Sequence, residues 1–214
     1  PIDKNSIVDW LESNPNNIWA LNTTSVNLIE EKKYLEAIPL LEKSIKLYPR
    51  QRGGNSPYGM LSMAHRELGQ SDDELLVLEK WAAIEDSATK LYERLMEIYA
   101  DRKDWSSVER SAKRFFSANP LSPVSHRFMA LKSQEMGDKR ASIQPLKRLL
   151  LLNPPDPVDL HFRLASALAE NAPEEAKRHV LQALEDAPRF RAAQNLLVRL
   201  AEPKVAPDEK AKAE

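Results

Sequence analysis

The feature that most constrains this chain is a proline that recurs, after apolar helical patterns, at a fixed interval. These prolines are Pro15, Pro49, Pro120, Pro154 and Pro188. Successive intervals are 34, 71, 34 and 34 residues, and 71 is two periods of 34 plus three residues, which fall within segment 50–55. A fixed period of this size indicates a repeat architecture, in which each unit buries its apolar face against its neighbours. We therefore expect stacked units of 34 residues.

Each period carries the pattern of two amphipathic helices. One stripe consists of Tyr34, Ala37, Ile38, Leu41, Ser44, Ile45 and Tyr48, at the spacing of one helical face. Ser56, Ser122 and Asp156 each precede a proline, which is typical of a capped helix start. No stretch alternates with period two, so the sequence predicts an all-α fold. The expected helices are 5–13, 17–30, 34–47, 56–68, 71–85, 88–101, 104–118, 122–136, 139–152, 157–170, 173–186 and 189–201.

Composition excludes several classes of function. Five glycines in 214 residues argue against a phosphate-binding loop, and the absence of cysteine excludes disulfides, thiolate metal sites and a cysteine nucleophile. The net charge of -1 gives no general attraction to nucleic acid. Mean hydropathy is -0.52, and no apolar run reaches the roughly 20 residues of a membrane span, so we expect no membrane insertion.

The period and its internal pattern resemble the tetratricopeptide repeat (TPR) family. The matching residues include Ser25, Tyr34, Ala37, Leu41 and Pro49 in the first unit, Tyr58, Ser62 and Gly69 in the second, Tyr92 and Pro120 in the third, Ala130, Gly137 and Pro154 in the fourth, and Ala165, Ala176, Ala183 and Pro188 in the fifth. The resemblance implies a right-handed α-α superhelix, a TPR-like solenoid, over residues 1–202. Its units would be 18–51, 55–88, 89–122, 123–156 and 157–190.

The two ends carry further expectations. Residues 1–15 have the pattern of a second helix without its first helix, so we interpret them as a half unit. Residues 189–201 form one more amphipathic stripe, which predicts a capping helix, and 203–214 lack periodic apolar residues, which predicts a disordered tail. Because the chain begins at Pro1 on half a unit, we interpret it as a C-terminal fragment of a larger protein.

Packing within the units depends on small side chains where helices cross. We expect these to be buried: Ala37, Ser62, Ala130, Ala165, Ala176 and Ala183. Glu74 and Trp81 stand where the resemblance implies small residues. Ala112 and Phe115 exchange the usual large and small roles in the third repeat. We therefore expect looser or rotated packing in the second and third repeats.

No pattern supports catalysis. The four histidines, His65, His126, His161 and His179, are far apart in sequence and lack metal-binding spacing, so we interpret them as packing residues. The acidic run 72–74 opens a helix, where the helix dipole alone favours carboxylates. We expect no catalytic residue, no metal, no cofactor and no enzymatic activity.

Charge is distributed in two blocks. Residues 72–101 hold nine acidic and three basic residues, whereas 102–150 hold eleven basic and four acidic ones. Either these charges pair across neighbouring helices, or they form a polarised surface for a charged protein partner. Nucleic acid is not expected, because aromatic residues that could stack on bases are not interleaved with the basic ones.

In the TPR family the first helix of each unit lines a concave groove that binds peptides. Register with that family gives these groove candidates: Trp19, Asn22, Val26, Met63, Arg66, Glu93, Glu97, Arg127, Leu131, Gln134, Phe162 and Ser166. The clamp that some members use for a terminal carboxylate is only half present, with Asn22, Lys90 and Arg94 at its positions. We therefore do not expect specificity for a carboxylate terminus.

The sequence thus favours a non-catalytic module that binds a protein or peptide. The alternative is a C-terminal accessory domain of a larger enzyme, such as a bacterial hydrolase or peptidase, or of an envelope protein. Self-association through one end of the solenoid is a third hypothesis. The partner is not identified by the sequence, and both the cytoplasm and the bacterial envelope remain open as locations.

Overall fold

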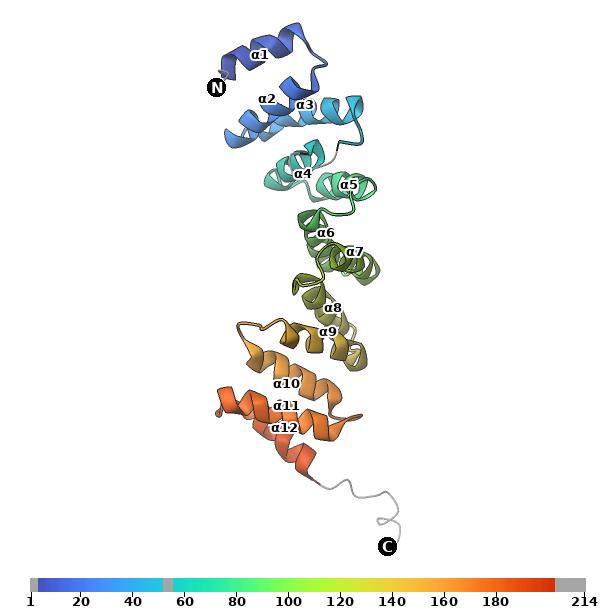
Figure 1. Cartoon of the computed structure of the whole chain (residues 1–214), viewed down its shortest axis with the longest axis vertical. Coiled ribbons are helices and arrows are strands. Elements are labelled where there is room, and N and C mark those ends of the chain that lie inside the picture. Colours follow the sequence, from blue (N-terminus) through green and yellow to red (C-terminus); the bar gives the residue numbers. More distant parts are fainter. Residues whose placement is uncertain (1–3, 52–55, 203–214) are drawn as a thin grey trace, which may run out of the picture. The chain divides into compact units, whose positions relative to one another are not determined.

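The computed structural model describes residues 4–51 and 56–202, and in these ranges the chain forms twelve α-helices and no β-strand (Figure 1). The helices are α1 (Lys4–Ser13), α2 (Ile18–Glu30), α3 (Tyr34–Leu47), α4 (Pro57–Glu67), α5 (Ser71–Ala82), α6 (Thr89–Asp101), α7 (Trp105–Ala118), α8 (Val124–Glu135), α9 (Lys139–Leu151), α10 (Pro157–Leu168), α11 (Pro173–Asp186) and α12 (Arg191–Ala201). The predicted all-α class is confirmed. The largest difference is at α5, which ends at Ala82 rather than at residue 85. There Glu85 accepts hydrogen bonds from the Ser87 amide and hydroxyl, which stabilise a turn instead.

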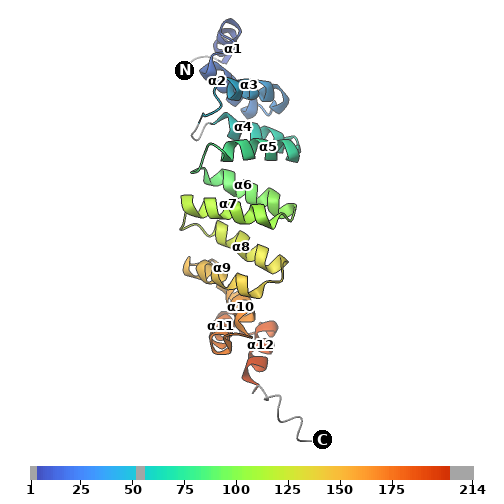
Figure 2. The ribbon, with the colours of Figure 1, turned by 90° about the vertical axis from the view of Figure 1, so that its right-hand side faces the viewer.

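The helices pack as consecutive antiparallel pairs within two compact units, Pro1–Pro120 and Leu121–Glu214 (Figures 1 and 2). The first unit contains α1 and the pairs α2–α3, α4–α5 and α6–α7. The second contains the pairs α8–α9 and α10–α11, followed by α12. The division falls between the third and fourth predicted repeats. A single continuous array over 1–202 remains a prediction, and the predicted tail 203–214 lies outside the described residues.

The turns inside the pairs repeat with the sequence period. Gly69, Lys103 and Gly137 each have a positive φ, of 71°, 58° and 66°, and they are 34 residues apart. Lys32, with φ 61°, precedes Gly69 by 37 residues, which is one period plus three. The three extra residues predicted within 50–55 lie between these two turns. Glycine is favoured at this left-handed position because it has no Cβ, so Gly69 and Gly137 adopt it without the strain that the two lysines bear.

The predicted helix starts are only partly correct. Asp156 caps α10 as expected, because its carboxylate accepts from the Val158 amide at 3.2 Å. The Ser122 hydroxyl accepts from the Val124 amide at 3.4 Å, although α8 begins at Val124, two residues later than predicted. Ser56 instead donates its hydroxyl to the Gln51 carbonyl. The other side-chain caps in the described ranges are Asn17, Asp104 and Asp138, each accepting from the amide three residues ahead.

The small residues predicted at helix crossings are all buried. Ala37, Ala165, Ala176 and Ala183 have no exposed surface, Ala130 is 1% exposed and Ser62 is 7% exposed. Ala130, Ala165 and Ala176 belong to one core cluster of the second unit, together with Leu146 and Leu164. Burial of the alanines lets the backbones of packed helices approach closely.

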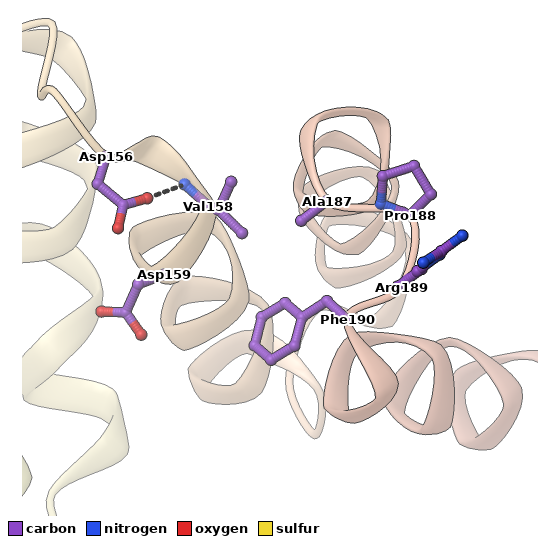
Figure 3. Close-up of a pocket in the computed structure, with 7 residues that line it drawn as sticks. All are labelled: Asp156, Val158, Asp159, Ala187, Pro188, Arg189 and Phe190. Atoms are coloured by element: carbon purple, nitrogen blue, oxygen red, sulfur yellow. Dashed lines mark hydrogen bonds between the residues drawn. The ribbon is translucent and has the colours of Figure 1, made fainter.

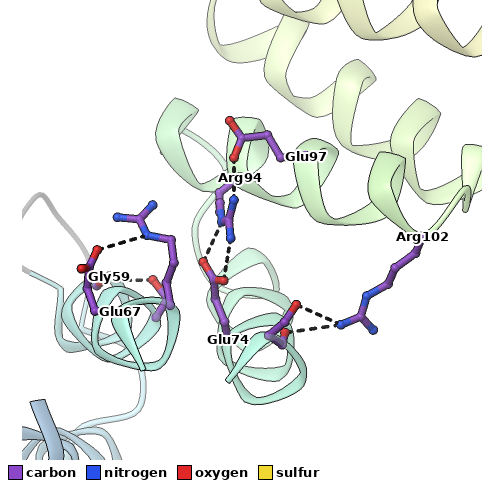
Figure 4. Close-up of polar contacts among 9 residues, drawn as sticks. Gly59, Glu67, Glu74, Arg94, Glu97 and Arg102 are labelled. Atoms are coloured by element: carbon purple, nitrogen blue, oxygen red, sulfur yellow. Dashed lines mark hydrogen bonds and ion pairs between the residues drawn. The ribbon is translucent and has the colours of Figure 1, made fainter. Parts of the chain in front are cut away.

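In the second repeat, neighbouring residues compensate for the size of Trp81 and for the charge of Glu74. A Cβ added to Gly59 on α4 would lie 3.1 Å from the Trp81 ring on α5, so the missing side chain provides the space that the indole fills. Glu74 is 1% exposed, and its two carboxylate oxygens accept from Arg94 Nε and Nη2 on α6 at 2.7 and 2.8 Å (Figure 4). At Glu74 a buried ion pair with α6 therefore stands in place of a small packing residue, and the looser or rotated packing stays a prediction.

Candidate functional site

Five of the twelve groove candidates line two neighbouring cavities in the second unit. One cavity, of about 640 Å³, includes Gln134, Phe162 and Ser166 in its lining. The other, of about 460 Å³, includes Arg127, Leu131 and Gln134. All five residues come from α8 and α10, the first helices of the fourth and fifth pairs. The structure thus brings these five candidates to one surface, which we call the α8–α10 surface.

The two cavities share part of their lining. Ala130, Gln134, Asp159 and Arg163 belong to both, so the cavities meet along facing turns of α8 and α10. The 460 Å³ cavity extends to the connection between α9 and α10, where it contacts Asn153, Pro154 and Pro155. Asn153 has a positive φ of 51°, which turns the chain at the end of α9. The two cavities together form an extended surface whose lining includes the apolar residues Leu131 and Phe162.

Polar groups are fixed at defined places on this surface. Arg163 Nη1 lies 3.5 Å from Asp159 Oδ2, one helical turn away. The Ser166 hydroxyl donates to the Phe162 carbonyl at 2.9 Å, and its oxygen can still accept a hydrogen bond from a ligand. Phe162 also packs against Phe190, with 4.8 Å between the ring centroids. These contacts hold the side chains in place before any ligand binds.

Asp159 and Arg163 were not among the predicted site residues. Their spacing, an acid four residues before a base on a first helix, is present in the sequence, but this pattern is also typical of ordinary solvent-exposed helices. Only the folded arrangement, in which both residues line the two cavities, distinguishes them.

The α10–α12 end of the second unit has a further cavity, of about 550 Å³ (Figure 3). Asp156, Asp159 and Val158 line it from α10, and Ala187, Pro188, Arg189 and Phe190 line it from the connection into α12. Its walls are mostly apolar, with carboxylates at one side and a guanidinium at the other. None of the predicted groove residues lies here.

The candidates in the first unit are more dispersed. Trp19 is 52% exposed and lines a cavity of about 580 Å³ with Ile7 and Trp10. Asn22 accepts a hydrogen bond from the Ser44 hydroxyl on α3 at 2.7 Å, so its amide oxygen serves packing inside the pair. Val26, Met63 and Glu93 are half-buried.

Two charged candidates of the first unit have partners of their own. Glu97 accepts from Arg94 Nη1 at 2.8 Å, and Arg66 Nε lies 3.9 Å from Glu67 Oε1 (Figure 4). Exposed pairs of this kind contribute little to stability, but they reduce the charge available to a ligand.

The charge blocks pair in part across neighbouring helices. Arg102 at the end of α6 lies 2.7 Å from Asp72 on α5, which joins the basic block to the acidic one. Lys139 and Lys147 on α9 pair instead with Glu170 and Glu175, at 3.4 and 2.6 Å. Some charges of the blocks are therefore paired between neighbouring helices, and the polarised surface for a charged partner stays a prediction.

The structure places two histidines together that the sequence separates. His161 on α10 and His179 on α11 approach with 2.9 Å between their Nδ1 atoms. Within residues 4–51 and 56–202, no group of three or more histidine, aspartate or glutamate side chains is placed to hold a metal ion. No helix in the described part of the chain combines the length and apolar character that a membrane crossing requires.

Comparison with solved structures identifies the fold. The TPR protein YrrB, described as having an unusual peptide-binding site, superposes with a TM-score of 0.65 at 12% identity, covering 90% of this chain and 98% of its own. MamA gives a TM-score of 0.61 at 14% identity, covering 88% and 98%. A tetratricopeptide repeat protein from Parabacteroides merdae gives 0.58 at 13% identity, covering 93% and 91%. No protein-family model matches the sequence, and no curated protein matches it either. The chain has the tetratricopeptide-repeat fold, a solenoid of helix pairs, as the sequence predicted.

Proposed function

We propose that this protein is a non-catalytic module that binds a protein segment or peptide on the α8–α10 surface. The observation that carries the proposal is the pair of adjoining cavities, whose lining includes five residues predicted from register with the TPR family. TPR folds typically serve as protein-binding scaffolds, and YrrB, which shares this fold, has a peptide-binding site. The remaining predicted groove residues, in the first unit, stay candidates for a longer interface.

The character of the surface favours an extended segment with both apolar and acidic side chains. Phe162, Leu131 and the prolines at 154 and 155 offer apolar contact area. Arg127 is exposed at the 460 Å³ cavity, whereas Arg163 has a carboxylate neighbour in Asp159. An acidic side chain of the partner would pair with Arg127, and salt would weaken that contact because exposed charges are screened beyond about 8–10 Å.

A peptide-display selection on the intact chain tests this proposal. Random peptides are selected on the wild type, and the affinities of the selected peptides are then measured for Phe162→Ala and Arg127→Glu by fluorescence anisotropy. We expect Phe162→Ala to weaken binding by about 2 kcal/mol, roughly thirty-fold, because buried aromatic anchors dominate such interfaces. Arg127→Glu should weaken the binding of acidic peptides, and this loss of affinity should be largest at low salt.

The matched control is Arg178→Glu, the same charge reversal at an exposed residue of α11 that lines neither cavity. Peptides that bind all variants equally would place the binding surface elsewhere. Circular dichroism of each variant confirms that the helices are intact.

A further inference from the structure

The contact between His161 and His179 joins the two helices of the fifth pair. Their Nδ1 atoms are 2.9 Å apart, their ring centroids are 5.1 Å apart and their planes are tilted by 31°. A neutral imidazole has one N–H and one bare nitrogen, so this contact forms only when one Nδ1 donates and the other accepts. Both side chains are half-buried between α10 and α11.

The charged groups around the pair come from α9 and α11. On α11, Glu175 Oε1 lies 3.9 Å from His179 Nε2, and the same oxygen lies 2.6 Å from Lys147 Nζ on α9. Burial lowers the pKa of His161, against the opposing effect of Asp186. Burial also lowers the pKa of His179, helped by His161, Lys147 and Arg178 and opposed by Glu175. Both lowered pKa values favour the neutral rings, and two neutral rings can form the observed hydrogen bond.

Protonation acts on this contact in two steps. One proton leaves the hydrogen bond intact, because a charged imidazole can still donate from Nδ1 to a neutral one. A second proton gives both Nδ1 atoms a hydrogen and both rings a positive charge. Two donors cannot remain 2.9 Å apart, and like charges at this distance repel.

We infer that the His161–His179 contact is a pH-sensitive joint that fastens α10 to α11 when neutral and opens when both rings are protonated. The inference is independent of the proposed function, although His161 precedes Phe162 and Arg163, which line the α8–α10 cavities. An ordinary histidine titrates near pH 6.5. Because the folded values are lowered, the stabilisation is present above about pH 6.5 and is lost as the pH falls through that value and the lower folded values.

Hydrogen–deuterium exchange of the full chain tests the joint. Protection of amides in α10 and α11 is compared at about pH 7.5 and about pH 5.5, corrected for intrinsic exchange and with EDTA present, using α2 and α3 as the internal reference. We expect α10 and α11 to lose protection relative to α2 and α3, because groups whose folded pKa is lowered lose their stabilising contribution as the pH falls.

Two variants separate the joint from general acid sensitivity. His179→Gln cannot take a charge but keeps groups that donate and accept, so the acid-induced loss of protection in α10 and α11 should become smaller. His126→Gln is the matched control, since His126 is a half-buried histidine of α8 in the same unit whose pKa is also lowered by burial. Loss that persists unchanged in His179→Gln, or that disappears in His126→Gln, would overturn the inference.

A second measurement covers the outcome in which His179→Gln does not fold. Imidazole ¹⁵N shifts of the wild type, recorded through the same pH range, give the titration of His161 and His179 directly. Two separate titrations, both below about pH 6.5, support the joint. Simultaneous titration of both rings at an ordinary pKa would contradict it.

Discussion

Arg94 should be the most consequential single side chain of the first unit. The Glu74 side chain is 2% exposed, and Arg94 neutralises it through two short hydrogen bonds, which raise the pKa of the guanidinium. We expect Arg94→Leu to lower the free energy of unfolding by about 3 kcal/mol, because it leaves a buried carboxylate without a counter-ion. Urea denaturation followed by tryptophan fluorescence measures the change, since Trp81 lies on the same helix as Glu74.

Substitution of the other partner, Glu74, should lower stability less. In Glu74→Leu, Arg94 keeps its contact with Glu97 and is 27% exposed, so we expect a loss of about 1 kcal/mol. The double variant Glu74→Leu/Arg94→Leu should be more stable than Arg94→Leu alone, because no buried charge remains. Equal losses in the two single variants would show that the carboxylate is not the residue that needs compensation.

The effect of substituting Gly59 on stability depends on one neighbour, Trp81. Gly59→Ala should destabilise the protein by about 1 kcal/mol, since its Cβ would lie 3.1 Å from the Trp81 ring. In a Trp81→Leu background the same change should stabilise by about 0.5–1 kcal/mol, because alanine is favoured over glycine in a helix. Thermal unfolding followed by circular dichroism measures all four proteins of this cycle. The same sign in both backgrounds would contradict the proposed compensation.

At the scale of single elements, helix crossings in the second unit are closely packed. Ala130 is 1% exposed on α8 and belongs to a core cluster with Leu146 of α9 and Leu164 of α10. Ala130→Leu should overpack this crossing and lower stability by about 1–3 kcal/mol. The readout is circular dichroism, because all four tryptophans lie in the first unit. Ala192→Leu, at an exposed position of α12, is the matched control and should leave the denaturation midpoint nearly unchanged.

The elements also show what sequence could and could not predict. Apolar periodicity placed every helix, because the core face of an amphipathic helix is repeated at each turn. Helix starts were less predictable: Ser56 and Asp156 both precede proline, but only Asp156 caps its helix with its side chain. A serine hydroxyl can donate as well as accept, and the Ser56 hydroxyl donates a hydrogen bond to a nearby backbone carbonyl. Which partner wins depends on the fold around it.

The same limit applies to the site. Register with the TPR family selected Phe162 and Gln134, which line the α8–α10 cavities, but it also selected Asn22, whose side chain is used inside its own pair. The His161–His179 contact was not predicted, because eighteen residues separate the two rings and their approach depends on the close packing of α10 and α11.

At the scale of the whole molecule, the two units should respond differently to mild acid. Burial lowers the pKa of His126, His161 and His179, and all three lie in the second unit. Groups with lowered folded values stabilise the protein above the unfolded pKa, near 6.5, and this contribution is lost as the pH falls below it. Ordinary carboxylates titrate near pH 4, so a change from about pH 7.5 to about pH 5.5 leaves them charged.

We therefore predict that urea denaturation resolves the two units when two signals are compared. Tryptophan fluorescence reports residues 1–120, where all four tryptophans lie, whereas far-UV circular dichroism reports helices of both units. From about pH 7.5 to about pH 5.5, the dichroism midpoint should fall more than the fluorescence midpoint, because the second unit unfolds first. In His179→Gln the difference between the two shifts should shrink. Equal shifts in both signals would mean either that the units unfold together or that the three histidines have no net effect on the second, and the variant distinguishes these two cases.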